Sequence, residues 1–388
     1  MRIDFKTGGP PWAVDGGRLA TELTIAGAGD DAVVDNIHFT VPSGFHAHPD
    51  CVAAALSTLC GRKYGEIAFD FPVSDRCRSM IEECYGVAIT VPGTIAPRVA
   101  GPNLMLNFSG GFDSLAAMLT AGRDLPMVSM DFGPPFEREE RYFSSFPTIV
   151  CKTDLRQKGY ALNDWRFMAS GSLLMADCLE AGAFGFGSIF EAAPWHFSPR
   201  TSSGSPRPQG PFGAVGAIDV AWTRPLTEFG TAMVVLSRAP ETVTPSLASL
   251  ASPGSEKLYR KQLLIDVASR RLGLPAPDRT SFVKPKRRTP WGKAFTVDFL
   301  ALFFVREYGR AFVEEWMDLP EDEEFAEASH GDLGFYLKYN PNLLGYIPAD
   351  IRNRVLNAFH ECGIFPYNEI DFNSFARVRK LLGRSYAV

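Results

Sequence analysis

The sequence predicts an α/β protein whose central part contains a parallel sheet. Between residues 103 and 195, short apolar segments alternate with segments of helical period. The first apolar segment, Leu104–Phe108, ends at a Ser-Gly-Gly turn, and a helical segment over 114–120 follows at once. Strands that alternate with helices imply right-handed crossovers and a parallel sheet, and ligands of such sheets bind at the carboxyl ends of the strands. We therefore expect a doubly wound sheet with its site after the first of these strands.

The remaining elements of the central part follow the same alternation. Strands are expected at 125–133, 148–154 and 183–190, with helices at 135–145 and 165–182, the second ending at Gly182. Two stretches rich in Pro, Gly and Ser, 198–213 and 239–255, are expected to be a loop and a linker. We expect this domain to span residues 101–250.

The two flanking regions have different patterns. Residues 1–100 predict a small α+β domain, because β-branched and aromatic strand segments alternate with two helical segments. Its strands are expected at 20–28, 32–41 and 65–71, and its helices at 48–65 and 73–86. Residues 251–388 predict a mostly helical region, with helices at 256–273, 296–316 and 349–363. The acidic stretch 318–332 is expected to be a solvated helix or linker.

Bulk composition excludes several classes of protein. The net charge of −5 over 388 residues argues against general nucleic-acid binding, which needs a clustered positive field. Seven cysteines without a C-x-x-C pair suggest buried thiols in a reducing compartment. The most apolar stretch, 294–305, is too short to span a bilayer and contains Asp298, so a buried helix is expected there. The first residues lack the apolar core of a signal peptide. The expectation is a cytoplasmic protein without a membrane segment.

The turn Ser109-Gly110-Gly111-Phe112-Asp113-Ser114 carries the main chemical prediction. The first N–H groups of a helix are unpaired and carry partial positive charge, and glycines before them let the backbone approach an anion. The hydroxyls of Ser109 and Ser114 add donors. A carboxylate beside bound phosphates would repel them, so Asp113 is expected to hold Mg²⁺, which takes one or two carboxylates together with phosphate oxygens. The alternative is a structural turn in which Asp113 caps the helix.

These six residues match the SGGxDS loop of the PP-loop ATP pyrophosphatases, whereas the GxxxxGK[ST] and GxGxxG patterns are absent here. The resemblance implies an adenine nucleotide α-hydrolase-like fold, with ATP and Mg²⁺ as cofactors and cleavage of ATP between its α- and β-phosphates. It also implies that residues 109–114 bind the nucleotide, together with Asn107 at the end of the preceding strand.

The segment that follows resembles the 7-cyano-7-deazaguanine synthases (the QueC type) over about residues 103–195. Asp131 and Gly133 of "VSMDFGPPFEREE" match that family's "DYGQ" segment, although Phe132 and Pro134 depart from it. The resemblance implies nucleotide binding by Gly187, with an acidic residue shortly after it, here Glu191. Asp131 is a candidate ligand of nucleotide or magnesium, with a plain strand-end cap as the alternative.

Two departures from that family matter. The substrate motif Pro-Asp-Cys-Arg is replaced by "APWHFSPR" (193–200), and the four-cysteine zinc cluster is missing, so no structural zinc is expected. His196 falls where the family holds its substrate and is a candidate general acid or base, with a packed loop histidine as the alternative. QueC-like relatives also occur in anti-phage defence, which implies a small carboxylate or deazapurine substrate, or a protein terminus.

A weaker resemblance to the synthetase half of the asparagine synthetases covers 256–292. It consists of a helix with Lys and Arg, then a Leu-Pro, then a basic loop. Lys286 in the loop 284–293 is a candidate catalytic group that would reach the phosphates, and a solvated loop is the alternative. His46 and His48 are expected to be surface histidines, because no third metal ligand is visible near them.

Three functions therefore compete. The first is a QueC-like, AMP-forming C–N ligase that adenylates a carboxylate or amide and passes it to ammonia or another amine, releasing AMP and pyrophosphate. The second is an asparagine-synthetase-like amide ligase acting on an amino acid or peptide. The third is a nucleotide-binding scaffold without turnover.

Overall fold

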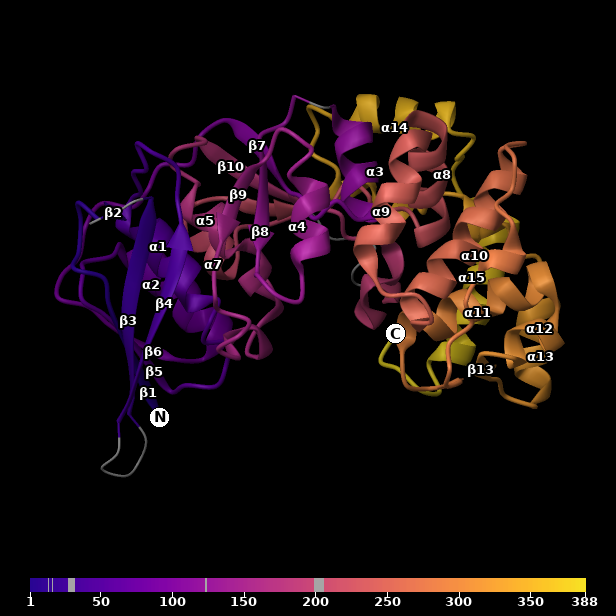
Figure 1. Cartoon of the computed structure of the whole chain (residues 1–388), viewed down its shortest axis with the longest axis horizontal. Helices are drawn as coiled ribbons and strands as arrows, with labels where there is room; N and C mark the ends of the chain where they lie inside the picture. Colours follow the sequence, from indigo (N-terminus) through magenta and orange to yellow (C-terminus); the bar gives the residue numbers. More distant parts are fainter. Residues whose placement is uncertain (13, 16, 27–31, 123, 199–205) are drawn as a thin grey trace. The chain divides into compact units, whose positions relative to one another are not determined.

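The computed structural model describes residues 1–12, 14–15, 17–26, 32–122, 124–198 and 206–388 (Figure 1). The chain forms two compact units, each assembled from several stretches of sequence. The first contains residues 1–109, 124–185 and 206–220, and the second contains the rest. The sequence predicts three consecutive segments, 1–100, 101–250 and 251–388. Each compact unit combines stretches that are not consecutive in the chain.

The first unit begins with a mixed sheet in the order β2-β3-β1-β5-β6, with β4 paired to β3. Its strands are β1 (Arg2–Lys6), β2 (Val14–Asp15), β3 (Arg18–Ala26), β4 (Val33–Thr40), β5 (Glu66–Phe69) and β6 (Ala88–Thr90). Strands β1, β3 and β4 pair antiparallel, whereas β1, β5 and β6 pair parallel. In β1 the buried Ile3 and Phe5 alternate with Asp4 and Lys6, as a strand with one covered face requires.

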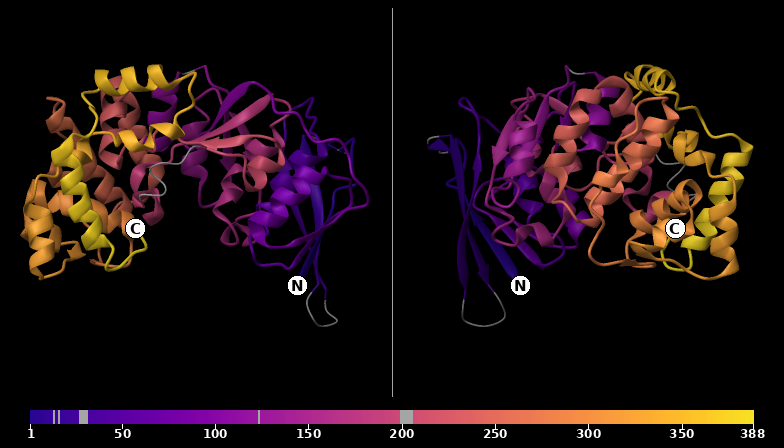
Figure 2. Two further views of the ribbon diagram at one scale, coloured as in Figure 1. Left: turned by 180° about the vertical axis from the view of Figure 1, so that it is seen from behind. Right: turned by 45° about the vertical axis from the view of Figure 1, so that its right-hand side comes forward.

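Helices α1 (Pro49–Ser57) and α2 (Asp75–Tyr85) cover one face of this sheet (Figure 2). The side chain of Ser74 caps the first turn of α2, and Gly86 ends the helix at a positive φ of 69°. This part of the chain is therefore a mixed sheet with helices on one face. The expected strand over 20–28 corresponds to β3, and residues 27 and 28 lie outside the described part of the chain.

The second sheet of this unit has the order β11-β10-β7-β8-β9. Its strands are β7 (Asn103–Asn107), β8 (Met127–Asp131), β9 (Ile149–Lys152), β10 (Ala181–Phe186) and β11 (Ile218–Val220). The ladders β7–β8, β8–β9 and β10–β11 are parallel. The strand order reverses between β7 and β10. Open α/β sheets bind ligands at such a reversal, which here lies at the carboxyl ends of these two strands.

Shorter helices complete the first unit: α4 (Glu137–Phe143), α5 (Ser170–Leu174) and α7 (Gly210–Ala214). The expected long helix over 165–182 is wrong. Residues 165–169 form a 3₁₀ helix, α5 ends at Leu174, and Glu180 has a positive φ of 47°. Gly171 lies so close to β8 that an added Cβ would be 2.5 Å from the Met130 sulfur, and this packing fixes the short helix on the sheet.

The second unit is almost entirely helical. It contains α3 (Phe112–Ala121), α8 (Glu228–Arg238), α9 (Val243–Leu250), α10 (Glu256–Arg271), α11 (Phe295–Tyr308), α12 (Arg310–Glu314), α13 (Glu323–His330), α14 (Arg352–Glu361) and α15 (Glu369–Leu382). Two short strands, β12 (Thr289–Pro290) and β13 (Met317–Asp318), pair parallel. Two 3₁₀ turns, η3 (Phe190–Ala192) and η4 (Pro194–Phe197), precede α8.

Two expectations for this unit need correction. The stretch 239–255 is not a linker, because it contains α9, whose Val243, Ser246 and Ser249 are buried. The helix expected over 296–316 is broken at Gly309, which has a φ of 87°, into α11 and α12.

The apolar stretch 294–305 is a buried helix, as predicted, and belongs to an aromatic core. Tyr336 stacks on Phe299 with ring centres 4.4 Å apart, and Phe303 lies 4.9 Å from the same ring. Within the described residues, every helix is too short or too polar to cross a bilayer. All seven cysteines are free thiols, and five of them are buried.

Candidate functional site

The glycine turn before α3 is fixed from within the second unit. Gly110 has a φ of 73°, which L-residues with a side chain rarely adopt, and Gly111 is the N-cap residue of α3. The Ser246 hydroxyl on α9 donates to the Gly110 carbonyl at 2.8 Å, and the Ser114 hydroxyl donates to the Gly111 carbonyl at 3.0 Å. The chain therefore enters α3 in one defined conformation, with the positive end of the helix at the turn.

Gly187 packs directly on the first turn of this helix. A Cβ at this position would lie 2.5 Å from the backbone nitrogen of Ser114 and 2.5 Å from the carbonyl carbon of Asp113. No side chain fits there, so Gly187 is required for this close approach. The structure thus brings Gly187 together with the start of α3, and the nucleotide binding that the resemblance implies for Gly187 stays a prediction.

Asp113 lies in the first turn of α3 beside two polar side chains. Its Oδ1 accepts a hydrogen bond from the Thr231 hydroxyl at 2.7 Å and lies 3.8 Å from the Lys261 ammonium. The Asp113 side chain is 28% exposed, whereas Lys261 is 7% exposed. Burial raises the pKa of the Asp113 carboxyl, and Lys261 acts against that rise. The carboxylate therefore faces solvent from the edge of a buried charge cluster.

The cluster continues behind Asp113 through α8 and α10. Glu228 accepts hydrogen bonds from Arg260 at 2.6 Å and contacts the Lys261 ammonium at 3.2 Å, and Arg260 also pairs with Glu256. Despite its burial, the pKa of Glu228 falls to about 2, because Arg260 and Lys261 stabilise the carboxylate. Glu228 is therefore ionised, and it holds both cations in place.

Glu191 is another buried carboxyl next to this group. It is fully buried, and its Oε1 accepts the backbone N–H of Glu228 at 2.8 Å. Among the described residues, its Oε2 has no hydrogen-bond partner. Burial and the nearby Glu228 charge raise the pKa of Glu191 well above its ordinary range.

The ionised groups of this cluster carry a net negative charge without a ligand. Asp113, Glu228 and Glu256 contribute three negative charges, and Arg260 and Lys261 contribute two positive ones. A polyphosphate that arrived alone would therefore leave negative charge uncompensated, so the arrangement suits a polyphosphate that brings its own cation.

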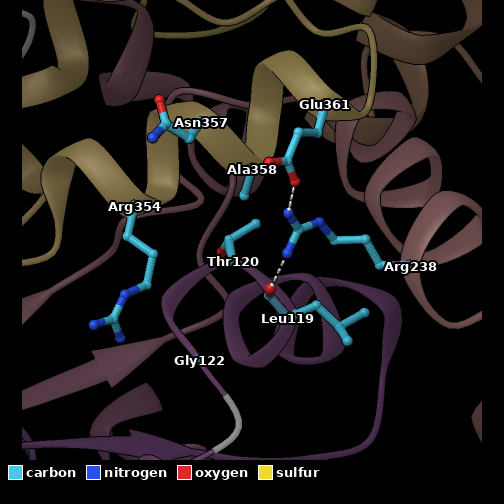
Figure 3. A pocket seen from close by; sticks show the side chains of 8 residues that line it. All are labelled: Leu119, Thr120, Gly122, Arg238, Arg354, Asn357, Ala358 and Glu361. Carbon is cyan, nitrogen blue, oxygen red and sulfur yellow. Dashed lines mark hydrogen bonds and ion pairs between the residues drawn. The ribbon is translucent and has the colours of Figure 1, made fainter.

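The other end of α3 is held by two arginines. Arg238 on α8 donates to the Leu119 carbonyl at 3.0 Å and pairs with Glu361, and Arg354 on α14 donates to the Ala121 carbonyl at 2.7 Å (Figure 3). Both guanidiniums satisfy carbonyls that a helix end leaves unpaired. The side chains border a hollow of about 450 Å³ at the end of α3 away from the glycine turn. We interpret these contacts as structural ones that stabilise the end of α3.

Three predicted site residues lie in the first unit, namely Ser109, Asn107 and Asp131. Asn107 ends β7; its amide donates to the Gly185 carbonyl on β10 at 3.1 Å, and its oxygen accepts from the Ser172 hydroxyl at 2.5 Å. Asp131 ends β8 and accepts the Gly133 N–H at 2.7 Å, and its other oxygen lies 3.4 Å from the Lys152 ammonium. These contacts match the strand-end cap named as the alternative for Asp131, and nucleotide contacts by all three residues stay predictions.

The two remaining candidates, His196 and Lys286, differ in their surroundings. His196 is buried in η4 with Nδ1 3.2 Å from the Phe190 carbonyl, and burial lowers its pKa to about 4. It is therefore neutral at neutral pH, which suits a packed histidine better than a general acid. Lys286 is exposed in the loop before β12. The contacts described above for the Asp113 cluster involve neither residue, and their catalytic roles stay predictions.

Sequence reasoning missed Lys261, Arg260, Glu228 and Thr231. The signal was present in α10, where "YRKQLL" places two adjacent cations among residues of the apolar face. A buried Lys or Arg is almost always paired, so such a pair predicts buried carboxylates nearby. The partners could not be identified, because Glu228 and Asp113 are distant in sequence.

Within the described residues, no three His, Cys, Asp or Glu side chains gather closely enough to hold a metal ion by themselves. Comparison of the chain with protein-family models, with curated proteins and with solved structures returned no match.

Proposed function

We propose that this protein is an AMP-forming, ATP-dependent C–N ligase of the PP-loop type. The observation that carries the proposal is the glycine turn at the start of α3, with Lys261 placed beside Asp113 by the buried Glu228. The reversal of strand order between β7 and β10 supports it, because the turn follows β7 and Gly187 follows β10.

In this proposal the first turn of α3 binds the β- and γ-phosphates of ATP. A carboxylate or amide oxygen of the substrate attacks the α-phosphorus, the bond to the bridging oxygen breaks, and pyrophosphate leaves. An amine then attacks the activated carbon, and AMP departs with the oxygen. Lys261 and the α3 N–H groups stabilise the charge that builds up on the pyrophosphate. The chain's own contribution is therefore mainly orientation and charge stabilisation.

A magnesium ion fits the residues present. Mg²⁺ commonly binds one protein carboxylate together with nucleotide phosphates, and Asp113 supplies a partly exposed carboxylate at the turn. Bound there, the ion would neutralise charge on the phosphates. The net negative charge of the cluster also favours a nucleotide that arrives with its cation.

Two resemblances bear on the substrate. The QueC-like segment favours a deazapurine carboxylate or a related acid, and its defence relatives extend the proposal to a protein terminus. The asparagine-synthetase-like amide ligase gains support from one observation. The helix that carries this second resemblance, α10, supplies Arg260 and Lys261 to the Asp113 cluster.

The test mixes the protein with Mg-ATP, ammonia and candidate acids, among them carboxydeazaguanine, aspartate and short peptides. We expect AMP and pyrophosphate, and about a 100-fold loss of both in Asp113→Asn. Asp75→Asn is the matched control, because Asp75 is exposed in the first turn of α2. Release of ADP would exclude this reaction class, and ATP binding without turnover would favour the scaffold.

The Asp113 carboxyl also predicts a pH dependence. Its raised pKa means that the folded protein protonates this group at a higher pH than an ordinary aspartate. Protonation removes the charge that would hold Mg²⁺, so AMP formation should fall as the pH drops through this raised pKa. Rate measurements at saturating Mg-ATP between pH 5 and 8 check this. In Asp113→Asn the residual rate should lack this acid limb.

A further inference from the structure

A second buried carboxylate of the helical unit, Asp298, lies outside the cluster described above. Asp298 is on α11, has no exposed surface, and accepts two hydrogen bonds on one oxygen. The Gly292 N–H donates to its Oδ2 at 2.7 Å, and the Tyr386 hydroxyl donates to the same oxygen at 2.5 Å. Among the described residues, its Oδ1 has no hydrogen-bond partner.

The two donors belong to segments that are far apart in sequence. Gly292 lies in the basic loop 284–293 and has a φ of 81°, and Tyr386 follows α15. The segments also touch directly, because a Cβ at Gly292 would lie 3.4 Å from the Ser385 hydroxyl. The Tyr386 ring packs on Phe295 with centres 5.2 Å apart. One carboxylate thus joins the end of the loop, the segment 383–388 and α11.

Burying this carboxylate is unfavourable. Burial raises the pKa of Asp298 to about 6, although both hydrogen bonds oppose the rise. An apolar residue in the same place would avoid this cost but would leave the Gly292 and Tyr386 donors without an acceptor. The geometry therefore gives the carboxylate a specific task, which is to hold these two donors.

We propose that Asp298 is the positioning residue of the basic loop 284–293, and that Tyr386 completes this anchor. At its other end the loop is held by the Lys284–Glu315 ion pair, and between the two ends it is held by the Arg288–Asp318 ion pair and by backbone pairing of β12 with β13. The exposed ion pairs are worth little, so the buried Asp298 contact fixes the end that carries Lys293. The catalytic consequence rests on the proposed function and on the prediction from the sequence that the loop reaches the phosphates.

Trypsin provides a test that is independent of activity. Lys293 directly follows Gly292, and Arg384 lies two residues before Tyr386, so cleavage after either residue reports release of the anchor. In native Asp298→Ala we expect cleavage at both sites to be about tenfold faster. Cleavage after Lys257, in the first turn of α10, reports general loosening of the unit and should not change. Mass spectrometry identifies each cut.

Two further variants separate positioning from packing. Asp298→Asn keeps an acceptor oxygen and should restore cleavage at both sites to the wild-type rate. Tyr386→Phe removes one donor and should speed cleavage after Arg384 more than after Lys293. Unchanged cleavage after Lys293 in Asp298→Ala, or an equal rise after Lys257, would overturn the proposal. If Asp298→Ala does not fold, equal cleavage rates of Tyr386→Phe and the wild-type protein would overturn the proposal.

With an active enzyme, Asp298→Ala should raise the KM for ATP about tenfold and change kcat little, and Asp298→Asn should restore KM. A wild-type protein that forms no AMP would contradict the proposed function while leaving the proteolysis result valid. The two proposals can therefore fail separately.

Discussion

Replacing Lys261 by methionine is expected to lower the rate of AMP and pyrophosphate formation about 1,000-fold. The Lys261 ammonium lies 3.8 Å from Asp113 and 3.2 Å from Glu228, which places a cation beside the first turn of α3. Removing a charged group that stabilises a transferring phosphoryl group costs about 10³-fold or more in rate. The variant would also leave Asp113 and Glu228 without the cation between them, which raises the pKa of Asp113 further.

Lys257→Met is the matched control for this experiment. Lys257 lies one turn earlier on α10 and is exposed, so its loss should leave the rate within about twofold of wild type. Lys261→Arg keeps the charge but not the compact ammonium, and we expect partial recovery. Circular dichroism of each variant separates a catalytic loss from unfolding.

Lys286→Met completes the series, because Lys286 is the candidate catalytic lysine named from the sequence, with a solvated loop as the alternative. A large loss in Lys286→Met with an active Lys261→Met would assign Lys261 a structural role. It would also make the exposed basic loop the phosphate-binding element. Comparable losses in both variants would mean that the loop and α10 act on the same phosphates.

The glycine turn could be predicted because its signals are local. An apolar strand, two glycines, and a carboxylate at the start of a helix all lie within a dozen residues. The alternation of strands with helices is also a local pattern, and it is sufficient for the parallel pairing of β7, β8 and β9. Gly187 could be predicted only through the family resemblance, since its role depends on contact with the backbone of α3.

The charge cluster could not be predicted, because its members come from distant parts of the sequence. Asp113, Glu228 and Lys261 lie on three different helices, and only tertiary packing brings them together. Ser246 was missed for a related reason. Its segment contains Pro, Ser and Thr and resembles a linker, yet the buried face of α9 is partly made of serines, whose spacing a search for apolar residues overlooks.

The long helix predicted over 165–182 fails for an electrostatic reason. The segment has good helical periodicity, but its Asp177 carboxylate binds the Arg98 guanidinium and the backbone N–H of His48. Those contacts form in the turns after α5, where Glu180 adopts a positive φ. Tertiary ion pairing therefore outweighs the local preference of these residues for a helix.

The Arg98 contacts predict the largest loss of stability in the first unit. Arg98 is 3% exposed, and its guanidinium is bonded on all three nitrogens. Nε pairs with Asp177, Nη1 donates to the Val215 carbonyl at 2.9 Å, and Nη2 donates to the carbonyls of Ala176 and Ala181 at 2.8 and 2.9 Å. Replacing Arg98 by methionine would leave a carboxylate and three carbonyls without this donor. Breaking a buried pair in this way costs about 3–5 kcal/mol.

Hydrogen exchange can localise that loss, because the two units act as internal references for each other. In Arg98→Met the slowest amides of α1 and β10 should exchange faster by about two to three orders of magnitude, whereas those of α11 should keep their rates. Arg78→Met is the control, since Arg78 forms an exposed pair with Glu82 on α2 and its loss should cost less than about 1 kcal/mol. Asp177→Asn keeps an acceptor for Nε, and its loss of stability should fall between those of Arg98→Met and Arg78→Met.

If Arg98→Met destabilised the unit no more than Arg78→Met, water would have to replace the guanidinium, and the bonds of Arg98 would contribute little to stability.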